Sequence, residues 1–230
     1  MKRLARALRQ HTDQLQGFGI NALPASLDSS GRRPEPSRET TPQEGKVRQL
    51  EELAETIKRC RRCTLYRTRT HCVISDGTPE ARLVFIGEAP GRDEDLQGKP
   101  FVGRAGQLLT KMIEAMGFRR EQVYICNVLK DRPPGNRTPE PEEINACLPF
   151  LEEQLAIVQP AVICVLGSVA AKALLGPNIS ITKIRGGVFD YQGIPLVPTF
   201  HPAYLLRNPP AKKYAWIDLK KVKQLLDAPR

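Results

Sequence analysis

The sequence predicts an α/β fold in which a mostly parallel central sheet carries helices on both faces. Short, mainly apolar segments that have the character of buried strands recur along the chain at 82–86, 122–126 and 161–166. Segments with the helical spacing of apolar residues separate them. Strands and helices that alternate in this way favour parallel pairing, with helices covering both faces of the sheet.

The first half of the predicted domain begins at Val47. Apolar residues at helical spacing predict a helix over 47–60, which ends at Cys60. The strand at 82–86 leads into a loop rich in glycine, and a helix at 104–116 and the strand at 122–126 follow.

The second half continues the alternation. Pro139 opens a helix that runs towards Val158, and acidic residues fill its first turn, as the helix dipole favours. The remaining predicted elements are a strand at 161–166, a short helix from Ser168 to Gly176, a hairpin-like turn at 192–193, a last strand at 194–199 and an amphipathic helix at 212–226.

Composition points to an anionic partner. The 230 residues contain 35 Lys and Arg against 25 Asp and Glu, which gives a net charge of +10. Such a basic chain favours nucleic acid as a partner, although a basic surface kept for solubility is the alternative. The same charge favours a monomer, because like-charged copies repel one another.

Residues 1–46 are predicted to be a disordered or weakly helical extension. Prolines punctuate 21–46 among Ser, Gly, Arg and Glu, a composition that buries little apolar surface. This tail is a candidate segment for a sliding clamp or another repair partner. No apolar run approaches the roughly 20 residues of a membrane span, and no apolar core of a secretory signal follows Met1, so we expect a cytoplasmic protein.

A carboxylate follows the first predicted strand. Glu88 lies in the motif GEAPG (87–91), and the same loop runs on through PFVGRAG (100–106). In open α/β sheets ligands bind beyond the carboxyl ends of the strands. The glycines let the backbone approach a ligand closely, so this loop is a candidate site rather than a simple connector.

Two further motifs follow strands of the same sheet. Asn127 begins NVLKDRPPGNR (127–137), and an amide that both donates and accepts can recognise the edge of a base. His201 begins HPAYLLRNP (201–209), which places two leucines on a proline-bracketed loop. The structural alternatives are a solvated basic loop for the first motif, and a turn-capping histidine with core leucines for the second.

In the cytoplasm, the six cysteines are more consistent with metal ligands or core residues than with disulfides. Cys60 and Cys63 form a CxxC at a helix end, and no strand leads directly into it as in a thioredoxin-like redox pair. Cys126 and Cys164 lie within predicted strands and are expected in the core. For Cys72 the sequence does not decide between a metal ligand and a core residue.

These motifs together resemble the family 4 uracil-DNA glycosylases, the iron–sulfur type of bacteria and archaea. The resemblance runs from about Val47 to the C-terminus and rests on GEAPG with PFVGRAG, NVLKDRPPGNR, HPAYLLRNP and the CxxC. It implies the α/β/α sandwich of uracil-DNA glycosylases, and an enzyme that hydrolyses the N-glycosidic bond of uracil in DNA and so initiates base excision repair.

The resemblance also implies roles for individual residues. Glu88 is expected to position water or to stabilise the cationic sugar, and His201 to donate to a uracil oxygen. The uracil-binding residues are expected to be Ala89 through its backbone, Phe101 by stacking and Asn127 by hydrogen bonds to the base edge. The DNA-contacting residues are expected to be Leu205 or Leu206, which insert where the base leaves, and Arg207, Lys130, Arg132 and Arg137 at the phosphates.

The family holds a [4Fe–4S] cluster with four cysteines, and this chain departs from that pattern at one of them. Cys60, Cys63 and Cys147 match three ligands, but Asp131 stands where the third ligand of the family lies. Three interpretations follow: Asp131 ligates iron through oxygen, which we favour from sequence; Cys72 supplies the fourth thiolate; or no cluster forms and packing holds the region.

Other functions are weaker matches to the sequence. Relatives that trap DNA covalently carry an extra basic loop with a histidine after the glycine motif, whereas Gly103 here leads straight into a helix. A protein of the same fold that binds uracil or single strands without catalysis is the main alternative. A generic nucleotide-binding protein is disfavoured, because neither a P-loop nor a dinucleotide fingerprint is present.

Overall fold

The computed structural model describes residues 41–228, and the predictions made for residues 1–40 lie outside this range. The first described helix, α2 (Pro42–Lys58), begins earlier than the predicted start at Val47. Thr41 caps it: its hydroxyl accepts the Glu44 N–H, and the Glu44 carboxylate accepts the Thr41 N–H at 2.8 Å. Pro42, which suggested a linker, fits at the first helical position because its missing N–H is not needed there.

A six-stranded sheet forms the centre of the domain, in the order β1-β3-β2-β4-β6-β5. Its central strands β3, β2, β4 and β6 run parallel, and the edge strands β1 and β5 pair antiparallel. This confirms the predicted mostly parallel sheet. The strand bounds are β1 Ser75–Gly77, β2 Leu83–Gly87, β3 Tyr124–Asn127, β4 Val162–Leu166, β5 Phe189–Tyr191 and β6 Ile194–Thr199.

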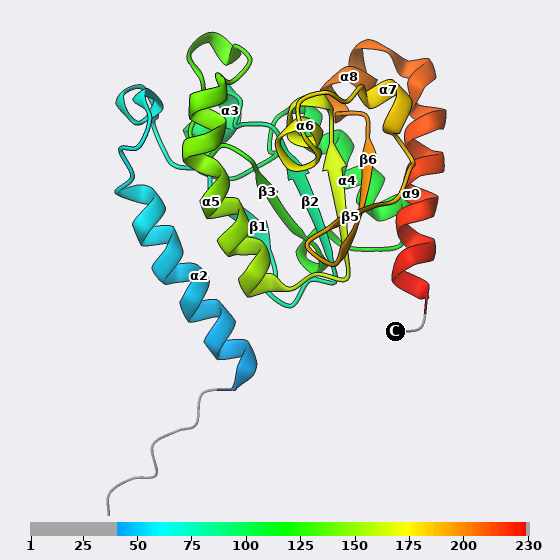
Figure 1. Ribbon diagram of the computed structural model, residues 1–230, viewed down its shortest axis with the longest axis horizontal. Coiled ribbons are helices and arrows are strands. Elements are labelled where there is room, and N and C mark those ends of the chain that lie inside the picture. The colour runs from blue at the N-terminus through cyan, green and yellow to red at the C-terminus, as the bar shows by residue number, and fades with distance from the viewer. Residues whose placement is uncertain (1–40, 229–230) are drawn as a thin grey trace, which may run out of the picture. The chain divides into compact units, whose positions relative to one another are not determined.

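Helices cover both faces of this sheet (Figure 1). Residues of α2, α5 (Pro141–Val158) and α6 (Ser168–Leu175) share one apolar cluster with Val84 and Ile86 of β2. Residues of α4 (Arg104–Ala115) and α9 (Lys212–Asp227) share the other cluster with Leu83 and Phe85. Successive side chains of a strand point to opposite faces, so a strand buried on both sides must be apolar throughout, as β2 is.

Several short elements are absent from the sequence-based prediction, because one or two turns leave too few residues for a periodic pattern. They are β1, α3 (Arg92–Gln97), α7 (Ile181–Ile184), α8 (Pro202–Arg207) and the 3₁₀ turns Thr64–Arg67, Arg120–Gln122, Pro134–Asn136 and Pro209–Ala211. The expectation that Leu205 and Leu206 lie on an irregular loop was therefore wrong, since both belong to α8. Within 41–228 no helix is long and apolar enough to cross a membrane.

The carboxyl ends of the parallel strands lie at one edge of the sheet. Gly87 at the end of β2 pairs with Asn127 at the end of β3, and Leu166 of β4 pairs with Thr199 of β6. The loops that follow these strands therefore meet, as the rule for open α/β sheets predicts.

A buried acidic residue ties α9 to this edge. Asp218 is fully buried, accepts the Thr199 hydroxyl at 2.7 Å and the Arg185 Nε–H at 3.0 Å, and forms an ion pair with Arg185. Thr199 is the last residue of β6, so this network fixes the strand end that leads to His201.

Replacing Asp218 should therefore destabilise the domain strongly. We expect Asp218→Ala to lower the free energy of unfolding by about 3–5 kcal/mol, because it leaves Arg185 unpaired in a largely buried position. Urea denaturation measures this change. Asp227→Ala, at an exposed position of the same helix, should change the value by less than about 0.5 kcal/mol. Equal effects of the two substitutions would contradict the role given to Asp218.

Candidate active site

A pocket of about 440 Å³ opens where the loops after β2, β3 and β6 meet. All five residues predicted for catalysis or base binding line it, namely Glu88, Ala89, Phe101, Asn127 and His201. They lie at or after the ends of the three strands β2, β3 and β6, and the parallel sheet brings these ends together.

The position of Phe101 depends on two glycines. Phe101 has a φ of 53°, in the left-handed region that side chains other than glycine rarely adopt. A Cβ added at Gly106 would lie 1.8 Å from the Phe101 carbonyl oxygen, and one added at Gly87 would lie 2.4 Å from the Phe101 ring. The glycines of the motif therefore let the aromatic ring pack over the end of β2.

Asn127 presents an unpaired acceptor to the pocket. The residue is 2% exposed. Among the buried side-chain oxygen and nitrogen atoms of residues 41–228, Asn127 Oδ1 is the one without a hydrogen-bond partner. A buried acceptor without a partner carries a large desolvation cost. Such a group in a pocket points to a ligand that donates to it.

His201 is held as a neutral donor. It is the N-cap of α8, and its Nδ1 accepts the Ala203 N–H at 3.1 Å. Burial, with a smaller contribution from Arg207, lowers the pKa of His201 to about 4. A neutral imidazole that accepts at Nδ1 carries its proton on Nε2, so the ring can donate from that nitrogen. The Phe101 ring lies 5.7 Å away, centroid to centroid.

Glu88 brings a carboxyl group to the same pocket. It is half-buried, and burial raises its pKa above the usual value. Its backbone is fixed, because its carbonyl accepts the Leu129 N–H at 3.0 Å. The side chain makes no hydrogen bond to another residue in the described part of the chain, and is therefore available to a water or a substrate.

Glu94 shapes the loop and was missed by sequence reasoning. Its carboxylate accepts the backbone N–H groups of Gly91, Val102 and Gly103 at 3.1, 2.9 and 2.9 Å. It thus joins the two ends of the segment that carries Phe101. The signal was present as Gly91-x-x-Glu94, the spacing at which an acidic side chain caps the start of a helix.

Two of the predicted DNA contacts were wrong. Lys130 is 1% exposed, and its Nζ donates to the Asn127 carbonyl and to Gln154 Oε1, both at 2.6 Å, so it cannot reach a phosphate. Leu205 is also 1% exposed, because it faces the core from α8. Leu206, next to it, is half-buried and remains accessible.

The predicted arginines lie at or near the mouth of the pocket. Arg207 and Arg137 line it, and both are exposed. Arg137 also pairs with Glu143, with nitrogen–oxygen distances of 2.9 and 2.6 Å. Arg132 donates to Asn136 Oδ1 at 2.6 Å.

A second, small hollow brings together the four predicted metal ligands, Cys60, Cys63, Asp131 and Cys147. Cys60 and Cys63 follow the end of α2, and Cys147 lies on α5. In residues 41–228 no three such side chains converge closely enough to hold a single ion. Ligands of a four-iron cluster each bind a different iron, so a cluster does not require them to converge on one point.

The cysteines of the described range are all free thiols. Burial raises the pKa of Cys147 to about 11, so this thiol keeps its proton unless a metal displaces it. Cys126 and Cys164 are fully buried in the strands β3 and β4, as predicted for core residues.

Comparison with known proteins decides the family. The model of the uracil DNA glycosylase superfamily matches residues 74–220. The chain is 51% identical over 161 residues to the type-4 uracil-DNA glycosylase of Thermotoga maritima, covering 69% of this chain and 84% of the relative. This chain belongs to the type-4 uracil-DNA glycosylases.

Two archaeal members of the family are similar over comparable lengths. The type-4 uracil-DNA glycosylase of Sulfurisphaera tokodaii is 45% identical over 190 residues, 79% of this chain and 86% of the relative. That of Archaeoglobus fulgidus is 42% identical over 184 residues, 76% of this chain and 92% of the relative. The superfamily match over residues 74–220 covers the loops that form the pocket.

The glycine that supports Phe101 gives a direct test of this geometry. Gly106→Ala should lower the free energy of unfolding by about 1–3 kcal/mol or more, because its methyl group would collide with the Phe101 carbonyl. Urea denaturation measures the loss. Gly45→Ala is the matched control, since this helical glycine has nothing within 4 Å of an added Cβ, and it should leave stability unchanged or raise it by up to about 1 kcal/mol. A harmless Gly106→Ala would contradict the packing described.

The state of His201 can be tested by pH titration. With a pKa near 4, the imidazole should stay neutral and Nε2-protonated from pH 8 to 5, whereas an unperturbed histidine is half-protonated near pH 6.5. Long-range proton–nitrogen NMR correlation distinguishes the forms, with His201→Gln to assign the signal. Because the folded pKa is lowered, the stability that this residue contributes is present above about pH 6.5 and falls as the pH drops towards 4. A midpoint near 6.5 would contradict the prediction.

Proposed function

We propose that this protein excises uracil from DNA by hydrolysing the N-glycosidic bond, the step that initiates base excision repair. One observation carries the proposal: the unpaired Asn127 Oδ1 lies in a pocket that also holds an aromatic ring, a neutral imidazole and a carboxyl group. The family of the chain supports the same reaction.

Asn127 suits the hydrogen-bonding edge of uracil. Uracil offers the N3–H donor and the O4 acceptor side by side, so Asn127 Oδ1 accepts from N3 while Nδ2 donates to O4. Cytosine presents the opposite pattern, an acceptor at N3 and a donor at N4. Binding cytosine would leave buried polar groups unpaired, which is the strongest available basis for rejecting it.

The rest of the base is held by contact with Phe101 and Ala89. A base inside a duplex is out of reach of the pocket, so uracil must leave the stack and enter it. Phe101 then stacks on the face of the ring, in place of the lost neighbouring bases. Ala89 contributes backbone contacts at the wall of the pocket.

His201 stabilises the leaving base. When the glycosidic bond breaks, the electron pair goes to the uracil ring and negative charge collects on its oxygens. The Nε2–H of His201 donates to the O2 atom, where its hydrogen bond strengthens as that charge develops. A neutral imidazole donates this hydrogen bond and keeps its proton. The proton is on Nε2 because Nδ1 accepts the Ala203 N–H.

Glu88 acts on the sugar side. Its carboxylate positions the water that attacks the anomeric carbon and, as a negative charge, stabilises the cationic character of the sugar in the transition state. Burial raises the pKa of Glu88, so we expect the acid limb of activity to lie above the ordinary pKa of glutamate.

The surface around the pocket is proposed to contact DNA. Leu206, rather than the buried Leu205, inserts into the gap that the flipped base leaves. Arg207, with Arg132 and Arg137, contacts the backbone phosphates, and the net charge of +10 supports the approach of DNA.

We also propose that the cysteine hollow holds a [4Fe–4S] cluster on the thiolates of Cys60, Cys63 and Cys147. When bound, the cluster would supply a cross-link between the segment that follows α2 and helix α5, and it would take no part in the hydrolysis. A monomeric, cytoplasmic protein stays a prediction.

The activity is tested with uracil-containing oligonucleotides. The wild-type protein should release uracil, so that alkali cleaves the strand at that position. Glu88→Gln should reduce the turnover by about 10²–10⁴-fold with little change in DNA affinity, because it removes the charge and the base. Binding is measured separately by fluorescence anisotropy.

The control for this experiment is Glu114→Gln, an exposed glutamate on α4, which should turn over like the wild type. Tight binding of uracil DNA without any strand cleavage by the wild-type protein would instead favour the non-catalytic alternative. Full activity of Glu88→Gln would overturn the role given to this residue.

A further inference from the structure

We propose that Cys72 is the fourth thiolate ligand of the cluster, in place of the cysteine that Asp131 has replaced. The proposal rests on the [4Fe–4S] cluster proposed above, and it differs from our preference on the basis of sequence alone, which was ligation by Asp131.

Both oxygens of Asp131 already have partners. Its Oδ1 and Oδ2 accept from Arg69 Nη1 at 3.1 and 2.9 Å. The Asp131 side chain is 8% exposed and that of Arg69 15%, so water screens the pair poorly. Taking the carboxylate from Arg69 to bind iron would leave a largely buried guanidinium without its counter-charge, which is strongly unfavourable.

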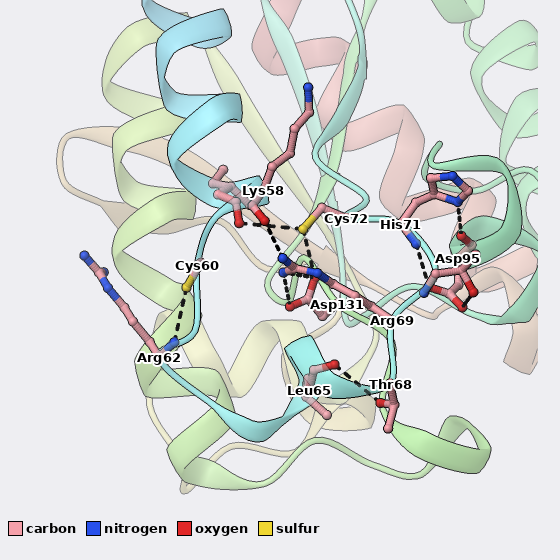
Figure 2. Close-up of polar contacts among 12 residues, drawn as sticks. Lys58, Cys60, Arg62, Leu65, Thr68, Arg69, His71, Cys72, Asp95 and Asp131 are labelled. Carbon is pink, nitrogen blue, oxygen red and sulfur yellow. Dashed lines mark hydrogen bonds and ion pairs between the residues drawn. The ribbon is translucent and has the colours of Figure 1, made fainter.

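Arg69 is itself held in place. Its Nη2 hydrogen-bonds to the Lys58 carbonyl at the end of α2 (Figure 2). The guanidinium therefore bridges the end of α2 and Asp131, and it engages both carboxylate oxygens.

The thiol of Cys72 lies beside Asp131. The Sγ–H of Cys72 donates to Asp131 Oδ1 at 3.1 Å and lies 3.6 Å from the Ile57 carbonyl oxygen, and Ile57 lines the hollow. Figure 2 shows the Cys72 sulfur and the Asp131 carboxylate pointing towards one another. Cys72 itself does not line the hollow, but it lies one hydrogen bond from Asp131, which does.

Backbone pairing explains why these two residues meet although they are far apart in the sequence. The Val73 N–H donates to the Lys130 carbonyl at 2.8 Å, beyond the ends of the paired strands β1 and β3 and two residues out of their register. Cys72 and Asp131 are the neighbours of these two bonded residues. This main-chain hydrogen bond therefore holds the thiol beside the replaced position.

The chemistry favours sulfur over oxygen. Iron–sulfur clusters are held by thiolates, whereas carboxylates suit harder cations. On ligation an Sγ–Fe bond forms, the Sγ–H bond breaks and the proton leaves to solvent, and no electron is transferred. Asp131 keeps its ion pair with Arg69, and the pair as a whole is neutral. It therefore adds no net negative charge beside the four thiolates.

Iron content decides the assignment. The full chain is purified anaerobically, reconstituted with ferrous iron and sulfide, and assayed for iron and acid-labile sulfide per chain. We expect about four irons for the wild type and for Asp131→Asn, and about three or fewer for Cys72→Ala. Cys164→Ala, a core cysteine away from the hollow, is the control and should match the wild type.

A double substitution distinguishes the loss of a ligand from misfolding as the cause of iron loss in Cys72→Ala. Cys72→Ala combined with Asp131→Cys places a thiolate at position 131 and should restore about four irons. Four irons in Cys72→Ala, or their loss in an Asp131→Asn chain that keeps its fold and its uracil excision, would overturn the proposal, and so would a wild-type chain without iron. Uracil excision is measured in parallel, so a chain that excises uracil but holds no iron would refute the ligand and leave the enzyme proposal standing.

Discussion

The pocket depends on the absence of a side chain at Gly87. This residue ends β2 and pairs with Asn127 at the end of β3. A Cβ there would lie 2.4 Å from both Asn127 Oδ1 and the Phe101 ring, the two groups proposed to bind the base. The aromatic face and the amide edge can thus converge only because the first residue of GEAPG is glycine. Gly106 completes the constraint by accommodating the backbone of Phe101 in its unusual conformation.

The segment Thr68–Cys72 connects the pocket to the cysteine hollow. Thr70 and His71 donate backbone N–H groups to the Asp95 carboxylate on α3, at 2.7 and 3.3 Å. Arg69 and Cys72 contact Asp131 instead, as Figure 2 shows.

Asp95 lies next to Glu94, whose carboxylate holds the loop that carries Phe101. A short, hydrogen-bonded path thus runs from the hollow to the base-binding loop. Through this path a cross-link in the hollow would steady the pocket while it remains outside the reaction.

Sequence reasoning found the pocket because its residues follow strands, and strand ends in a parallel sheet share one edge. Glu88, Asn127 and His201 could be assigned in this way before any contact was known. Lys130 could not, since its position in a basic loop hides the fact that its side chain turns inwards to Gln154, which lies on α5. Long-range partners of this kind decide burial, and local composition does not report them.

The two leucines of HPAYLLRNP illustrate a second limit. Successive residues of a helix point about 100° apart, so Leu205 faces the core while Leu206 stays accessible. Without knowing that α8 exists, the sequence offers no way to choose between them. The helix is short and begins at a proline, which made a loop the natural interpretation.

His201 shows that a structural role and a chemical role can be the same contact. Taken alone, a histidine that caps a helix needs no catalytic explanation. Here the cap commits Nδ1 as the acceptor of the Ala203 N–H, and this leaves the proton on Nε2, where a departing base would need a donor. Burial keeps the ring neutral, and the network of Thr199, Asp218 and Arg185 fixes the strand end from which it projects. Without the cap either nitrogen could carry the proton, so the geometry that orders α8 is also the geometry that sets the chemistry of the imidazole.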